Sequence, residues 1–320
     1  MAVRFFLALA AGLALAGCGG NPLGKTEEPA PIEPIPDPPP DIPDDFIPKE
    51  AVAGSVEGVG LKDWAADAPT IRVSMDAQVL PELTGDFTRD TAFDVTRDGH
   101  TYYGYSYQSS VENRKAVVLV RASGGASAAS AMEPGQFANG RPDMYHSGSA
   151  LYRADVYRAP RGGLFNYTGS YAGLLNVGPA AGTPPGSLPP TEPYRTSGTS
   201  LITADFTRMK VSGGVTGRKV EDALPSGASV PADLPDIALW TTGITADGDF
   251  SGVVYRGDNA PAADPLDQDW KAAGRYDGIF AGIAASDVAV VMLFDPIGNG
   301  RVWEQGTIVG PCTRSSGGSC

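Results

Sequence analysis

The segment Tyr276-Asp277-Gly278-Ile279-Phe280-Ala281-Gly282 alternates large aromatic residues with small or polar ones. Successive side chains of an extended chain point to opposite faces, so Tyr276 and Phe280 share one face with both glycines. Glycine weakens the interior of a strand, and it marks positions where a sheet bends tightly or another group approaches the backbone. Small closed barrels need both features. The segment therefore predicts a strand in the wall of a barrel.

The last half of the chain contains eight strand-like runs of this kind, separated by turn signals and without a convincing helical pattern. They cover about 164–176, 199–208, 210–219, 236–245, 249–256, 271–282, 285–294 and 301–310. Closing such a meander removes its free edges and fills its interior with side chains. We therefore expect an all-β chain whose residues 162–311 form an eight-stranded antiparallel up-and-down barrel. Gly, Asp and Lys occur on both faces of these strands, so we expect a soluble barrel rather than a transmembrane one.

Residues 52–161 also read as β-rich, but less regularly, and we expect them to form a smaller separate sheet. Thr70–Met75 alternates polar and apolar residues, 114–121 is a Val/Leu run, and 149–158 alternates again. The Asp98-Gly99 turn signal predicts a hairpin between 92–96 and the strand that follows. The Ala/Gly/Ser-rich residues 124–148 are expected to be loop, with a short helix around 128–132.

Tyr103, Tyr105 and Tyr107 fall on one face of the strand after Asp98-Gly99. An aromatic ladder that stabilises the sheet is the commoner reason for such a row. An interaction face is the alternative, because tyrosine is enriched at binding surfaces.

The N-terminus, Met1 to Cys18, has Arg4 followed by an apolar run that ends in Leu15-Ala16-Gly17-Cys18. The run is too short to span a membrane and has the length of a signal-peptide core. Its last four residues resemble a bacterial lipobox, which implies cleavage of residues 1–17 and acylation, including a palmitate-type chain, at Cys18. An ordinary secretory signal with a chance cysteine is the alternative. Several acyl chains would anchor the protein stably to a membrane.

Residues 18–51 are predicted to be an acidic tether. Ten prolines lie between Asn21 and Glu50, with eight acidic residues and two lysines. Such a segment cannot bury enough apolar surface to fold. An extended polyproline conformation would hold the folded part up to roughly 90 Å from the lipid.

The rest of the composition excludes several kinds of function. The net charge of −13 argues against binding to nucleic acid and against electrostatic docking on anionic lipid. His100 and His146 belong to no zinc motif, and a lone histidine in a loop is usually a surface or capping residue. Acidic turns such as Asp247-Gly248-Asp249 lack the EF-hand spacing. With no nucleophile elbow or phosphate-binding motif either, we expect neither an enzyme nor a bound metal or cofactor.

Cys312 and Cys320 are the two cysteines that remain after Cys18. An exported protein meets an oxidising compartment, so we predict that they form a disulfide that closes the tail 312–320. The residues between them are small and polar, and the short loop should stabilise the fold only slightly.

The order of short glycine and aromatic motifs in 164–311 resembles the C-terminal barrel of transferrin-binding protein B-like surface lipoproteins. These motifs are Tyr167–Gly173, Ala204–Phe206, Gly248–Gly252 and Tyr276–Gly282. The resemblance implies that residues 52–161 form a handle-like sheet packed against the barrel. The family's Glu-Leu-x-Gly-like step is replaced here by 287–290, and the chain has one handle and barrel unit where the transferrin binders have two.

Two kinds of function remain open. The resemblance implies a lipid-anchored outer-membrane or cell-surface protein that captures a ligand, in iron or nutrient acquisition. Its expected partners are a protein or metallophore ligand and an outer-membrane receptor, and no ligand-binding residue can be named. The alternative is a structural or assembly lipoprotein of the outer membrane or periplasm that binds no small ligand.

Overall fold

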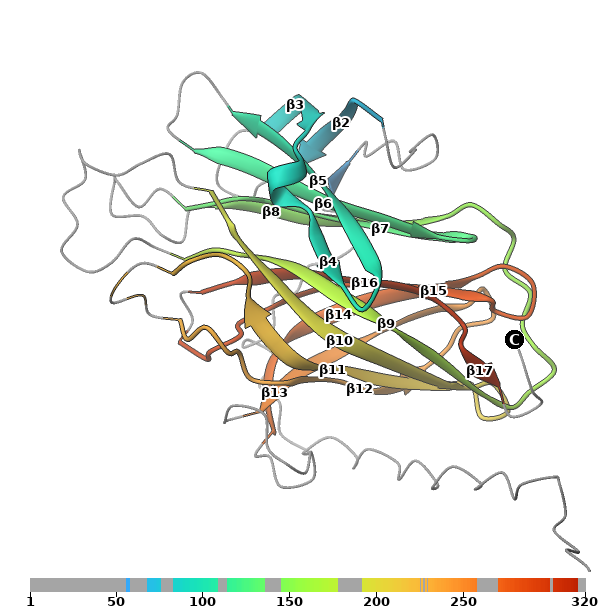
Figure 1. Cartoon of the computed structure of the whole chain (residues 1–320). Helices are drawn as coiled ribbons and strands as arrows, with labels where there is room; N and C mark the ends of the chain where they lie inside the picture. Colours follow the sequence, from blue (N-terminus) through green and yellow to red (C-terminus); the bar gives the residue numbers. More distant parts are fainter. Residues whose placement is uncertain are drawn as a thin grey trace, which may run out of the picture. The chain divides into compact units, whose positions relative to one another are not determined.

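The computed structural model describes residues 56–57, 68–75, 83–108, 114–135, 145–177, 192–224, 226, 228, 230–257, 270–299 and 302–315. All of them belong to the compact unit formed by residues 37–320. Within these ranges the chain forms two antiparallel sheets and one short 3-10 turn, Thr91–Phe93, and no α-helix (Figure 1). No helix of the described part is long and apolar enough to cross a membrane.

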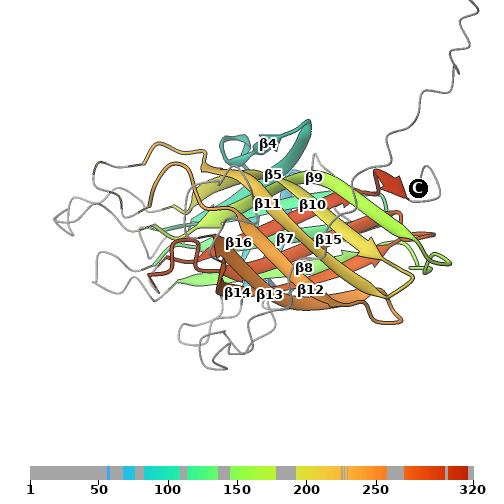
Figure 2. The ribbon, with the colours of Figure 1, turned by 90° about the horizontal axis from the view of Figure 1, so that it is seen from below.

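The predicted eight-stranded barrel is confirmed. Its strands are β9 (Leu164–Leu175), β10 (Tyr194–Asp205), β11 (Lys210–Val220), β12 (Ile237–Gly243), β13 (Asp249–Gly257), β14 (Trp270–Ala281), β15 (Asp287–Phe294) and β16 (Glu304–Pro311). Each pairs with the next in sequence, and β16 pairs back to β9, which closes the barrel (Figure 2). A short strand, β17 (Arg314–Ser315), adds to β9. The second strand begins earlier than expected, at Tyr194.

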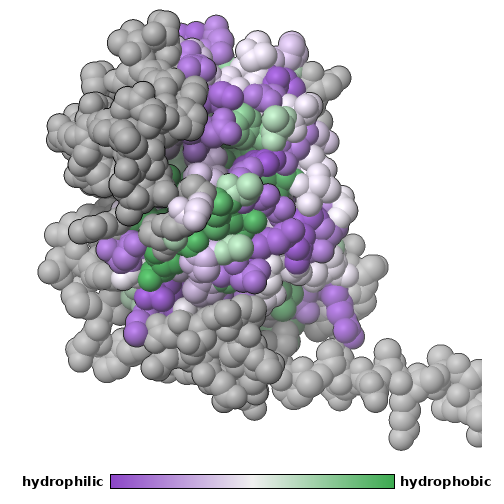
Figure 3. Space-filling model, turned by 60° about the vertical axis from the view of Figure 1, so that its left-hand side comes forward, coloured by the Kyte–Doolittle hydropathy of each residue, from purple (hydrophilic) through white to green (hydrophobic). Residues whose placement is uncertain are grey.

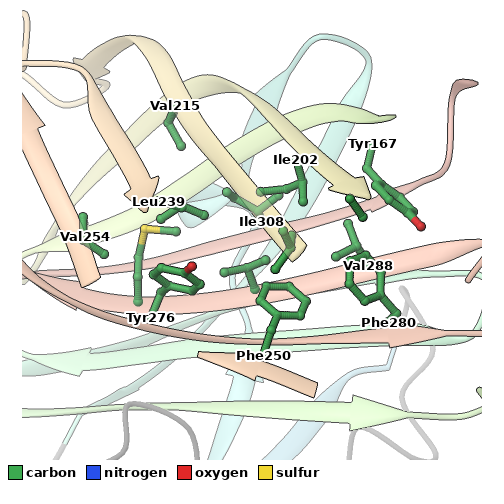
Figure 4. Close-up of a cluster of buried hydrophobic side chains, with 14 of the residues drawn as sticks. Tyr167, Ile202, Val215, Leu239, Phe250, Val254, Tyr276, Phe280, Val288 and Ile308 are labelled. Carbon is green, nitrogen blue, oxygen red and sulfur yellow. The ribbon is translucent and has the colours of Figure 1, made fainter. Parts of the chain in front are cut away.

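Aromatic and aliphatic side chains fill the barrel (Figure 4). Glycines on neighbouring strands make room for the aromatic rings. Phe250 of β13 lies opposite Gly278 of β14, and Tyr276 of β14 lies opposite Gly252 of β13. A Cβ atom added at Gly278 would lie 2.2 Å from the Phe250 ring, and one at Gly252 would lie 2.7 Å from the Tyr276 hydroxyl oxygen. The alternation of glycine and aromatic residues is therefore a reciprocal packing arrangement between two strands.

The region before the barrel forms a second sheet, here called the handle. Its strands are β1 (Val56–Glu57), β2 (Thr70–Met75), β3 (Leu83–Arg89), β4 (Val95–Arg97), β5 (His100–Gln108), β6 (Lys115–Ser123), β7 (Ala126–Glu133) and β8 (His146–Arg153). β1 and β2 contact β8, so the sheet curls and encloses an apolar core of its own. Asp98 and Gly99 both have positive φ and form the predicted turn between β4 and β5.

The expected loop with a short helix around 128–132 is wrong, because residues 126–133 form strand β7, which is buried on both faces. Ala129 and Ala131 belong to the handle core, whereas Ala126 and Ala128 pack against apolar residues of β14, β15 and β16. The run of small side chains lets the handle and the barrel approach closely. High alanine content favours a helix in isolation, and here the tertiary contacts on both faces override that preference.

Polar contacts join the handle to the barrel along this interface. The buried Tyr102 hydroxyl donates to the Ser170 carbonyl oxygen at 2.7 Å and accepts from the Val309 amide at 3.1 Å. The Arg121 Nε donates to the Val309 carbonyl oxygen at 3.0 Å. The Asp287 carboxylate accepts from the Ser123 hydroxyl. Because unpaired polar groups are costly to bury, these hydrogen bonds fix the position of the handle against the barrel.

Candidate binding surface

The interior of the barrel is a packed core. Its buried side chains come from all eight strands, and the Phe280 ring contacts the rings of Phe206 and Phe250, with centroids 5.2 and 4.9 Å apart. Aromatic pairs at such distances attract one another beyond the area that they bury. A ligand inside this part of the barrel would have to displace these side chains.

A buried cluster of polar side chains also lies inside the barrel. The Glu304 carboxylate accepts hydrogen bonds from the Arg218 guanidinium at 2.5 Å, the Tyr171 hydroxyl at 2.6 Å and the Thr196 hydroxyl at 2.6 Å. Both charged side chains are fully buried, and the Arg218 guanidinium also lies over the Phe294 ring. Three donors therefore satisfy this buried carboxylate.

The protonation of this cluster follows from its contacts. Burial and the negative charge of Glu304 hold the pKa of Tyr171 well above its ordinary value, so its hydroxyl remains a donor. Burial alone would lower the pKa of Arg218, but Glu304 and Tyr171 reverse this effect, so that its pKa is raised. Arg218 therefore stays charged beside Glu304, and the cluster joins side chains of four strands.

The two ends of the barrel differ in their connections. Short turns at 206–209, 244–248 and 282–286 join strands at one end, and the segment 154–163 leads from β8 into β9 there; we call this the turn end. The long connections 176–193, 221–236, 258–269 and 295–303 leave the opposite end, which we call the loop end.

The handle has its short turn and its long connection at the same two ends as the barrel. Its β6–β7 turn lies at the turn end, where the Gly125 amide donates to Asp287 at 3.2 Å. Its long β7–β8 connection starts at the loop end, where the Gly135 amide donates to the Asn176 side chain at 3.0 Å. Long connections of both sheets therefore leave the molecule on the same side. Ordered strands that present long loops at one end are a common arrangement of binding proteins.

Charged side chains tie the described parts of the loop end together. The Arg195 guanidinium pairs with the Asp222 carboxylate and donates to the carbonyl oxygens of Ala92 and Asp94 in the handle. Lys115 of β6 lies 3.3 Å from Glu192 ahead of β10. In Figure 3, where the left-hand side of Figure 1 comes forward, apolar side chains gather near the centre of the face and polar ones border them.

The two histidines are not the surface residues that the sequence suggested. His146 is buried and its Nδ1 lies 2.6 Å from the Glu133 carboxylate, which also pairs with Arg114 at 3.1 Å. His100 is half-buried, and its Nδ1 lies 2.7 Å from an Arg121 nitrogen. The pairing of β7 with β8 places His146 opposite Glu133, which sequence spacing could not reveal. The described residues contain no group of three or more His, Cys, Asp or Glu placed to hold a metal ion.

The row of tyrosines faces the handle core. Tyr105 is fully buried there, and Tyr103 and Tyr107 are half-buried at the edge of the same cluster. Phe87 lies against Tyr107 with ring centroids 5.3 Å apart. The ladder interpretation is therefore the one that the packing supports.

Of the predicted site residues, Cys18 and Cys320 lie outside the described residues. Cys312 follows β16 directly, is half-buried against the barrel core, and its amide donates to the Ser286 carbonyl oxygen at 2.7 Å. Acylation of Cys18 and pairing of Cys312 with Cys320 remain predictions.

The fold is thus a closed eight-stranded barrel with a curled antiparallel sheet against its wall. No protein-family model matches the chain, and no curated protein is similar to it in sequence. Similar solved structures exist, and those compared below are of transferrin-binding protein B.

Three of these structures illustrate the degree of similarity, each with a TM-score of 0.34. The intact Ap-TbpB, with N and C lobes, is 10% identical, and the match covers 78% of this chain and 53% of that one. The vaccine antigen from Haemophilus parasuis Hp5, as a double mutant, is 13% identical over 76% and 51%. Isotype 1 from serogroup B Neisseria meningitidis is 16% identical over 76% and 50%. The chain thus spans about half the length of these structures.

Proposed function

We propose that the chain is a lipid-anchored binding protein of the outer membrane or cell surface, not an enzyme. Residues 1–17 are its signal peptide, Cys18 carries the lipid, and 18–51 form the tether. It captures a protein or metallophore ligand at the loop end, in iron or nutrient acquisition, and an outer-membrane receptor takes the ligand over.

The observation that carries this proposal is the shared direction of the long connections. Two sheets with separate cores are locked together by buried hydrogen bonds, and both send their long connections to the loop end. The paired strands fix the two ends of each long connection, and binding residues are often carried on loops that a rigid scaffold positions. The side chains that fill the barrel argue against a ligand site inside it.

The anchor is tested by fractionation. The Cys18→Ala variant lacks the acylation site and should move from the membrane fraction to the soluble fraction. Protease shaving of intact cells that make the wild-type chain should release the folded part. A Cys18→Ala variant that stays in the membrane fraction would contradict lipid anchoring.

Ligand capture is tested with matched surface variants. Ala223 and Asp233 are exposed at the loop end, and Ala246 and Asp247 are exposed at the turn end. Arginine at both positions of the loop-end pair should weaken retention of ligand from iron-limited growth medium, whereas the same change at the turn-end pair should not. No retained ligand with wild-type protein would instead favour a structural lipoprotein. Equal retention by both variants would show that the ligand is captured away from the loop end.

A further inference from the structure

Two large apolar side chains stand exposed together at the turn end. Val156 is 77% exposed and Ile283 is 73% exposed. Val156 lies two residues before Arg158, which forms a parallel bridge with Ile283 and whose amide donates to the Gly282 carbonyl oxygen at 3.1 Å. Among the described residues only two other large apolar side chains, Leu164 and Leu201, are exposed.

The backbone around Ile283 is held in place despite an unfavourable conformation. Ala284 and Ala285 have φ values of 56° and 54°, a region that residues with a Cβ atom rarely adopt. The turn is secured by the Tyr167 hydroxyl, which donates to the Ala285 carbonyl oxygen at 2.6 Å. Strain of this kind persists only where the surrounding structure fixes it, and it concentrates at functional positions.

Exposed basic side chains lie at the same end of the barrel as this apolar pair, although the chain as a whole is acidic. The exposed basic residues of the turn end are Arg158, Arg161, Arg208, Lys210 and Arg314. Its acidic residues are Asp155, Asp205, Asp247, Asp249 and the buried Asp287. Asp249 pairs with Arg153 at 2.6 Å, and Asp205 lies 3.7 Å from Arg208. The Gly163 amide donates to the Thr207 hydroxyl at 2.9 Å, so the segment 154–163 and the β10–β11 turn form one continuous rim.

We infer that the turn end docks on an anionic lipid surface, with Val156 and Ile283 in the interfacial layer and the arginines on lipid phosphates. Apolar side chains within a basic rim are the combination that holds proteins to such surfaces. This inference rests on the proposed lipid anchor at Cys18. The chain between the lipid anchor and the handle is long enough for this orientation. Residues 19–55 can span roughly 100 Å when extended, and the barrel is only about as long as its 12-residue strand β9, about 40 Å. Docking in this way would turn the loop end away from the membrane.

Quenching by brominated lipid tests the contact in the complete lipidated chain. The wild-type chain has four tryptophans, and each variant adds one at an exposed position. Ile283→Trp places it at the turn end, and Leu201→Trp places it on the barrel wall. The protein is reconstituted in vesicles of phosphatidylcholine with brominated phosphatidylglycerol. We expect the added fluorescence of Ile283→Trp to be quenched several-fold more strongly than that of Leu201→Trp. Adding Arg158→Glu and Arg161→Glu to Ile283→Trp should reduce this quenching.

Each outcome has a distinct meaning. Equal quenching of the two tryptophans in protein that floats with the vesicles would overturn the docking, and would leave a protein partner as the occupant of the turn end. Flotation also reports separately on the anchor, because protein that does not float with the vesicles would contradict acylation at Cys18 and thereby remove the basis of the docking. Ligand retention through the loop end is measured independently of both.

Discussion

Arg218 and Glu304 show how much single residues inside the barrel can matter. Both are fully buried, and removing one partner of such a pair leaves the other charge without compensation. Glu304→Gln should therefore lower the free energy of unfolding by about 3–5 kcal/mol in urea titrations. The double variant Arg218→Met with Glu304→Gln should regain part of this loss, because no buried charge then remains.

The control for this pair is Arg208→Met at the turn end, whose side chain is 82% exposed and which should change stability little. A double variant less stable than Glu304→Gln alone would show that the hydrogen bonds of Arg218 matter more than its charge.

The contribution of His100 to stability should depend on pH, because its surroundings lower its pKa. Burial and the charge of Arg121 lower its pKa below 6.5, while Asp98 opposes them in part. Because the unfolded chain binds this proton more tightly, the contribution of His100 to stability is present above pH 6.5 and is lost as the pH falls below it. An NMR titration should find the His100 pKa below 6.5, and Arg121→Gln should raise it. A pKa at or above 6.5 in the wild-type chain would contradict this prediction.

At the scale of elements, the pairing of β13 with β14 depends on glycine. A methyl group at Gly278 would meet the Phe250 ring, so Gly278→Ala should destabilise the protein by about 1–3 kcal/mol in denaturant titrations. Adding Phe250→Leu should relieve part of this cost. Gly243→Ala in β12 is the matched control, since a Cβ there would meet nothing within 4 Å. Equal losses from Gly278→Ala and Gly243→Ala would mean that backbone preference, rather than the ring, sets the cost.

At the scale of the whole molecule, the handle and the barrel should unfold together. The Tyr102 hydroxyl bonds to backbone groups of two barrel strands, so Tyr102→Phe should cost about 1–3 kcal/mol. Native-state hydrogen exchange should show the same loss for amides of β6 in the handle and β15 in the barrel. Tyr152→Phe, a half-buried ring of β8, is the control. Independent opening of β6 at a much lower free energy would show that the two sheets unfold separately.

Local patterns in the sequence were sufficient for the barrel and for much of the handle. Glycine and aromatic alternation, the turn signals and the period-2 runs located all eight barrel strands, because neighbouring residues alone determine which face of a strand each side chain occupies. The Asp98-Gly99 turn could also be predicted from the sequence, since few residues adopt positive φ without strain.

Tertiary structure alone decided the features that depend on residues far apart in the chain. β7 became a strand because its small side chains are enclosed between the handle core and the barrel wall, against its local helical preference. The burial of His146 beside Glu133, the Arg218–Glu304 pair and the exposed Val156–Ile283 pair all depend on which strands become neighbours. Strand pairing and sheet docking are set by the fit of the whole core, and this information is not contained in any short stretch of sequence.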